Sequence, residues 1–363
     1  MDVIFPFGFP FPTAWYLTLY VLSLVVHAMF MNCVLAGTAY LAVVGVFNGA
    51  PIRGERRTSL ADILRDWMPF MLSATITAGV APLLFLQVLY KSSFYSAHLL
   101  LFHRWMLILP VLILGFYALY VLKSGRVGRW LPPVRMAVGL VPVVCMVFTA
   151  YAWSENHLLS LCEDVWPGLY GEEQTDFRAR QIIPRLGIWF FGAFPAMGVW
   201  AAWMLRGLVD MEEESRNREI RRCAVLSVGG MALAMGCALW YYLWMESEKR
   251  EAVTSAMASP YLVMAILGLA VQSGAWLTLW RNPSSPRGHL WAATVGAVAT
   301  LLGSTVVRES LRVSAIDVSG LRDAHAHAAS VGGLSVFLVC ALINTALIVW
   351  CVTIVRRGAG NRP

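Results

Sequence analysis

Long apolar runs separated by short polar segments form the dominant pattern of this chain. A bilayer core of about 30 Å needs about 20 apolar residues in a helix, and backbone polar groups in lipid must be satisfied within the segment. The pattern therefore predicts an all-α polytopic membrane helix bundle of about nine transmembrane helices, and we expect residues 1–363 to form a single integral membrane domain. The spans lie at about residues 14–47, 67–90, 99–122, 131–153, 184–205, 223–245, 260–280, 289–307 and 329–355.

The basic residues alternate between the connecting segments. Of the 28 Lys and Arg residues, 18 lie in segments 48–66, 123–135, 206–222, 281–288 and 356–363. Cytoplasmic loops carry the excess of Lys and Arg, so this alternation predicts an N-terminus outside and a cytoplasmic C-terminus. The segments expected outside are 154–183, 246–259 and 308–328. We expect a multi-pass protein of a bacterial inner membrane.

Composition supports the membrane assignment and limits the classes of partner that we expect. Hydrophobic residues make up 58% of the chain and charged residues 13%, whereas a soluble domain carries about 25% charged residues. The first span follows no basic n-region or cleavage site, so we expect it to be mature structure. The net charge of +7 is spread over loops, which predicts contact with membrane lipid and no nucleic acid. The cysteines include no C-x-x-C pair, so neither a zinc ribbon nor covalently attached haem is indicated.

His27 is the strongest candidate for a metal ligand. It lies within the first span, in "LSLVVHAMFMNCVLAG", where an ionisable group is costly and is a functional hypothesis by default. A neutral imidazole facing the bundle interior is able to ligate haem iron. It is equally able to hydrogen-bond to a neighbouring helix. No histidine occurs between His157 and His289, so a methionine such as Met264 in "PYLVMAILG" is a candidate second axial ligand.

Glu309 is the unusual carboxylate of the chain. The stretch "TVVRESLRVSA" places Arg308, Glu309 and Arg312 at the outer end of the eighth span. In one interpretation, the glutamate neutralises one arginine while the other reaches to water. In the other, Glu309 ligates or faces a cofactor and Arg312, one turn along, pairs with a carboxylate or propionate.

These motifs resemble those of cytochrome bd quinol oxidase subunit I and its distant relatives. His27 matches the haem-binding histidine of the family's first helix. The segment "TAGVAPLLFLQVLYKSSFYSAHLL" (77–100) is similar to its second and third helices, and Glu309 to Arg312 is similar to its eighth-helix E-x-x-R. The resemblance implies haem b, with Glu309 and Met264 as further haem ligands.

Several family features are absent from this sequence. The fifth-helix histidine has no counterpart, no Asp or Glu occurs from Trp67 to Ser154, and the long quinol-binding loop is short. We therefore do not expect oxygen reduction. The expected function is that of a membrane-integral subunit of a respiratory electron-transfer complex, which binds haem b and links the quinone pool to periplasmic partners such as a c-type cytochrome or an iron–sulfur protein. The alternatives are a cofactor-free membrane anchor and, third, a transporter.

Overall fold

The computed structural model describes residues 3–45, 59–124, 127, 130–171, 177, 180–208, 211–315, 325 and 333–360. Within these residues the chain is helical and contains no strand, which confirms the predicted all-α class. The long helices are α1 (Phe11–Tyr40), α2 (Leu60–Leu89), α4 (Phe102–Lys123), α5 (Pro132–Leu159), α7 (Ile182–Gly207), α8 (Glu213–Leu243), α10 (Ser259–Arg281), α11 (Arg287–Ala315) and α13 (Gly333–Gly360). The short elements are η1 (Leu41–Gly45), α3 (Lys91–Leu100), η3 (Glu163–Val165), α6 (Trp166–Tyr170) and α9 (Ser247–Thr254).

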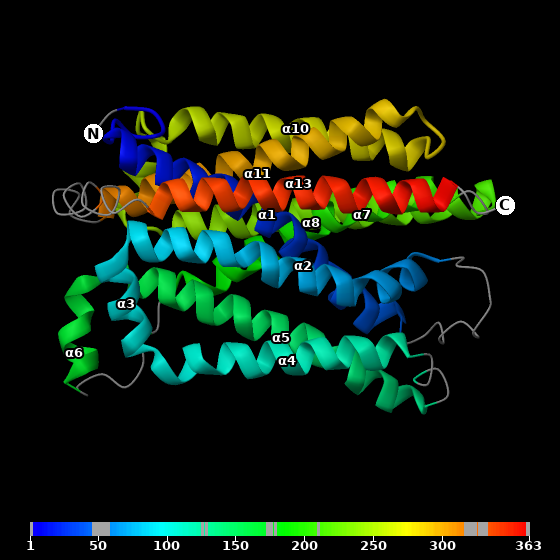
Figure 1. The fold of residues 1–363 in the computed structure, drawn as a ribbon, viewed down its shortest axis with the longest axis horizontal. Helices are drawn as coiled ribbons and strands as arrows, with labels where there is room; N and C mark the ends of the chain where they lie inside the picture. Colours follow the sequence, from blue (N-terminus) through cyan, green and yellow to red (C-terminus); the bar gives the residue numbers. More distant parts are fainter. Residues whose placement is uncertain are drawn as a thin grey trace.

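The long helices run side by side along one axis of the molecule (Figure 1). In the described part of the chain, eight of them are long and apolar enough to cross a membrane, and α13 adds a further helix of 28 residues. The chain is thus a multi-pass helix bundle. Helix α1 begins at one end of the bundle and α13 finishes at the other (Figure 1).

The bundle has two ends, which we call the Glu309 end and the Arg221 end. The Glu309 end contains the start of α1 and the final turns of α2, α5 and α11. The Arg221 end contains the first turns of α8 and the final residue of α10. Short helices α3 and α6 lie at the Glu309 end (Figure 1).

Close backbone contacts hold pairs of helices together. Gly268 of α10 faces Gly296 of α11, and a Cβ added at Gly268 would lie 2.7 Å from the Gly296 carbonyl oxygen. Small residues permit this approach, and in lipid the resulting van der Waals packing drives helix association. The α1–α2 pair is antiparallel, because Gly37 faces Met68 while Tyr16 contacts Phe85.

Two helices extend well beyond the predicted spans. Helix α5 continues to Leu159 and α11 to Ala315, whereas the sequence placed 154–159 and 308–315 in outer segments. Ser154, Glu155 and Asn156 are almost fully buried. The apolar pattern ends before the helices do because these last turns carry polar side chains that are nevertheless buried in the bundle, so a hydropathy boundary does not mark the helix end.

Candidate functional site

Glu309 is the centre of a buried polar cluster at the Glu309 end. Its side chain on α11 is 0% exposed. The Tyr90 hydroxyl, just after α2, donates a hydrogen bond to Glu309 Oε1. Arg312, one turn along α11, places Nη1 3.4 Å from Glu309 Oε2. The carboxylate therefore has both a hydroxyl donor and a guanidinium partner inside the bundle.

The two arginines of α11 share one tyrosine. Arg308 Nη2 donates to the Tyr20 hydroxyl at 2.8 Å, and Arg312 Nη1 lies 3.4 Å from the same oxygen. The Arg312 guanidinium also lies over the Tyr90 ring, 4.6 Å from its centroid, within the range of a cation–π interaction. Arg308 is thus bonded to α1 and is half-buried.

Helices α5 and α7 bring further polar groups to the cluster. Arg312 Nη2 contacts His157 Nδ1, and since a guanidinium only donates, this ring nitrogen must accept. Arg185 of α7 is 6% exposed, hydrogen-bonds with Tyr241 of α8, and lies within electrostatic reach of Arg308 and Arg312. The hydropathy pattern places His157 in an outer segment and therefore does not indicate its contact with Arg312.

The cluster carries more positive than negative charge. Arg185, Arg308 and Arg312 all lie within electrostatic reach of His157, and Glu309 is the carboxylate paired with Arg312, which leaves two positive charges in excess when all four groups are ionised. The Nε groups of Arg308 and Arg312 are buried without a hydrogen-bond partner among the described residues. Burying uncompensated charge is costly, so this arrangement is suited to an anionic group that enters from outside the chain.

A second ion pair lies beside the cluster and does not change the excess of positive charge. Arg104 of α4 pairs with Glu155 of α5, whose side chain is fully buried. The sequence contains a signal for this pair, because Glu155 is the first carboxylate after an acid-free stretch that starts at Trp67. The pair is neutral overall and ties α4 to α5.

His27 has the geometry of an oriented ligand. Its Nδ1 lies 3.0 Å from the Thr75 carbonyl oxygen of α2. A carbonyl only accepts, so Nδ1 carries the proton and a neutral ring keeps its lone pair on Nε2. Metal-ligating histidines are commonly oriented in this way. Gly79 makes room for the ring, since a Cβ there would lie 2.9 Å from His27 Cε1 and Nδ1.

The predicted ligands do not converge on one point. Gly79, beside His27, and Tyr90, beside Glu309, are separated by 11 positions of the α2 segment, or about 16 Å of helix. His27 and Glu309 therefore lie beside different turns of the α2 segment. Met264 is half-buried on α10, which packs mainly on α11 and α8, whereas His27 faces α2. Among the described residues no group of three His, Cys, Asp or Glu is placed to hold a metal ion.

His325 closes the Glu309 end beside the start of α1. Its ring is 1% exposed, with Nε2 donating to the Leu89 carbonyl at 3.1 Å and Nδ1 lying 2.9 Å from Thr13 Oγ1. Burial lowers the pKa of His325, an effect that the hydrogen bond to the Leu89 carbonyl partly opposes. The neutral ring fits this pair of partners, with Thr13 as donor.

Comparison of the chain with protein-family models, with curated proteins and with solved structures gives no match. The features of the molecule that bear on its function are therefore the bundle, the charge-rich cluster around Glu309 and the orientation of His27.

Proposed function

We propose that this protein is the membrane-integral subunit of a respiratory electron-transfer complex and that it binds a b-type haem through His27. The observation that carries the proposal is the hydrogen bond from His27 Nδ1 to the Thr75 carbonyl. It orients the imidazole and leaves Nε2 available as an axial ligand inside the bundle.

The arginine excess supports a cofactor that carries carboxylates. Tyr20 and His27 are seven positions apart on one face of α1, about 10 Å along the helix. Tyr20 bonds Arg308 and Arg312, so both arginines lie two turns of α1 away from the histidine, toward the Glu309 end. His27 would hold the iron, and the arginines would receive the propionates.

Glu309 has a different role in this proposal from that of a haem ligand. Its carboxylate is already bonded by Tyr90 and paired with Arg312. It stabilises the arginine cluster and keeps Arg312 in place for an incoming anion. Met264 remains a predicted ligand, on a helix whose main contacts are with α11 and α8.

A bound b-type haem would supply a one-electron centre. The chain's own residues orient the imidazole through Thr75 and compensate the charge of the cofactor through Arg308 and Arg312. Electrons would pass between the quinone pool and a periplasmic partner such as a c-type cytochrome or an iron–sulfur protein. Reduction of oxygen is not part of the proposal, because spans two to four lack carboxylates.

One observation favours a second candidate, a cofactor-free anchor subunit. The internal pairing of Glu309 with Tyr90 and Arg312 satisfies the carboxylate without any ligand. In this candidate the cluster fastens the helix ends together, and His27 only bonds α1 to α2.

The visible spectrum of the purified protein separates the two candidates. We expect a Soret band in protein produced with ample haem, and a pyridine haemochrome assay that reports b-type haem. His27→Gly should lose the band, and added imidazole should restore it, because the ligand then enters the vacated position. His103→Gly is the matched control, since His103 is exposed on α4 and should leave the spectrum unchanged. Protein without any Soret band would favour the anchor.

Gly79→Ala tests the orientation of the ring without removing it. The new Cβ would lie 2.9 Å from two His27 ring atoms, so the imidazole must move from the Thr75 carbonyl. We expect a shifted or weakened Soret band. Gly236→Ala on α8, where a Cβ meets open space, is the control. A spectrum that Gly79→Ala leaves unaltered would count against ligation by His27.

A further inference from the structure

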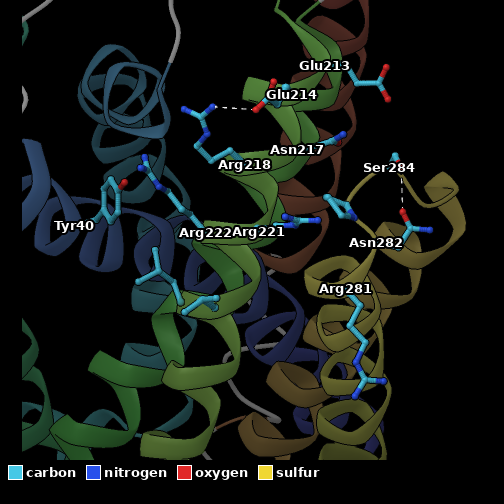
Figure 2. A pocket seen from close by; sticks show the side chains of 13 residues that line it. Tyr40, Glu213, Glu214, Asn217, Arg218, Arg221, Arg222, Arg281, Asn282 and Ser284 are labelled. Atoms are coloured by element: carbon cyan, nitrogen blue, oxygen red, sulfur yellow. Dashed lines mark hydrogen bonds and ion pairs between the residues drawn. The ribbon is translucent and has the colours of Figure 1, made fainter.

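The Arg221 end carries a groove of about 1070 Å³ between α8 and the turn that follows α10. Figure 2 shows the side chains that line it. Arginines from both sides contribute, together with asparagine amides and a serine hydroxyl. The lining includes Asn217, Arg218, Arg221 and Arg222 of α8, together with Arg281 and Asn282 at the end of α10.

Two of the four lining arginines have no partner among the residues that the structure describes. Arg218 lies 3.6 Å from Glu214, and Arg222 lies 2.8 Å from Glu219. Arg221 and Arg281 make no hydrogen bond or ion pair with any described residue and remain exposed. In Figure 2 Arg221 extends from α8 toward the turn that carries Asn282. Both guanidinium groups are therefore available to an anion.

The turn after α10, which forms one wall of the groove, is held in place by hydrogen bonds from α7. Arg206 of α7 donates through Nη2 to the carbonyl oxygens of Pro283 and Ser285, at 3.1 and 2.8 Å. Ser284 Oγ donates to Asn282 Oδ1 at 2.9 Å, so the amide nitrogen of Asn282 remains a donor for a ligand. The turn therefore presents the Asn282 amide as a donor held in position.

The groove changes from polar to apolar along α8. Asn217 and Arg221 are followed, one turn further, by Val225, which is 54% exposed. The apolar span of α8 begins just after Arg222, and Arg281 is the last residue of α10. The arginines thus lie at the boundary between the apolar part of the bundle and water, the level of phospholipid phosphates.

We propose that this groove binds a phosphate group, and that the phosphate is that of an anionic phospholipid headgroup. Arg221 contacts the phosphate oxygens and Asn282 donates from the turn, and the first part of an acyl chain lies against Val225. The exposed Arg281 side chain, which points away from Arg221 in Figure 2, rotates to reach the same phosphate. Guanidinium forks match phosphate oxygens in pairs, which is why arginine suits this task. Glu213 and Glu214 at the rim oppose binding, so the net preference depends on the two free arginines.

The proposal is tested on the delipidated, detergent-solubilised protein by native mass spectrometry with added phosphatidylglycerol. Binding should weaken about 5-fold in Arg221→Gln and about 30-fold in Arg221→Gln/Arg281→Gln, as expected for basic residues near a lipid surface. Arg287→Gln is the matched control, because this exposed arginine lies at the same end outside the groove lining. Glu214→Gln should strengthen binding, because it removes a rim carboxylate and frees Arg218.

Two further arms identify the source of the phosphate. Phosphatidylcholine should bind more weakly than phosphatidylglycerol, because its choline cation meets the arginines. Inorganic phosphate alone should give no thermal stabilisation. A phosphate-induced stabilisation that Arg221→Gln/Arg281→Gln abolishes would overturn the lipid assignment in favour of a soluble phosphate. Equal binding of phosphatidylglycerol by the wild type and the double variant would overturn the site itself.

Discussion

Both ends of the bundle contain several arginines, but the surroundings of these arginines differ. At the Glu309 end, Arg312 and Arg185 are buried and bonded to carboxylate, tyrosine or histidine partners on α1, α5, α8 and α11. At the Arg221 end, Arg221 and Arg281 are exposed and free of partners among the described residues. Burial therefore decides the role of the arginine side chain. Buried arginines connect helices and carry positive charge that an anion would compensate. Exposed arginines are free to attract anionic lipid headgroups.

The largest effect should come from the carboxylate of the buried cluster. Glu309→Gln leaves the buried Arg312 without its negative partner, so we expect a loss of about 3–5 kcal/mol in the free energy of unfolding and a low yield of folded protein. Glu214→Gln at the Arg221 end removes an exposed carboxylate and should change stability by less than about 0.5 kcal/mol. Thermal unfolding in detergent measures both. If the two variants lost similar amounts of stability, the two ends of the bundle would not differ in the way we propose.

The hydroxyl of Tyr90 should have the next largest effect. Tyr90→Phe removes one donor to the buried Glu309 carboxylate, and the expected cost is about 1.5–3 kcal/mol because the acceptor is charged and fully buried. Tyr95→Phe is the control on the adjoining helix α3, where the side chain is 42% exposed. If the two variants unfold at the same temperature, the Tyr90–Glu309 bond does not stabilise the cluster.

A smaller effect should follow from pH through His325. Burial lowers the pKa of this ring below its usual 6.5, so the unfolded chain binds the proton more readily than the folded one. The contribution to stability is then fully present above about pH 6.5 and is lost progressively as the pH falls below it. Relative to wild type, His325→Gln should show a flatter decline in unfolding temperature between about pH 7 and 5. His103→Gln, altered at an exposed position, should follow the wild type throughout.

The smallest effect on stability is expected at the Arg221 end. Arg218→Gln breaks an exposed pair with Glu214 at 3.6 Å, with side chains 60% and 82% exposed, and should cost no more than about 0.5 kcal/mol. Arg312→Gln is the comparison at the other end, where loss of the partner leaves Glu309 buried and under-compensated. Unfolding curves that rank these two variants in the reverse order would contradict the contrast between the ends.

Part of the candidate site could be predicted from the sequence. The cost of placing ionisable groups in lipid singled out His27 and Glu309, and the E-x-x-R spacing anticipated that Arg312 lies near Glu309, which the structure shows at 3.4 Å. The partners from distant segments could not be predicted, since nothing local relates Tyr20, Tyr90 and His157 to α11. His27 and Glu309 also appeared to belong to one pocket, whereas the α1–α2 packing separates them along the bundle.

The sequence by itself determined the class of protein, because runs of apolar residues long enough for a bilayer leave only the helix as a way to satisfy the backbone. It also marked the helices that carry ionisable groups. Only the tertiary structure decided which of those groups meet. The antiparallel packing of α1 on α2 set His27 against Thr75, and the convergence of α1, α2, α5, α7 and α11 assembled the polar cluster that contains Glu309. Contacts between residues hundreds of positions apart arise from helix packing, which local periodicity does not encode.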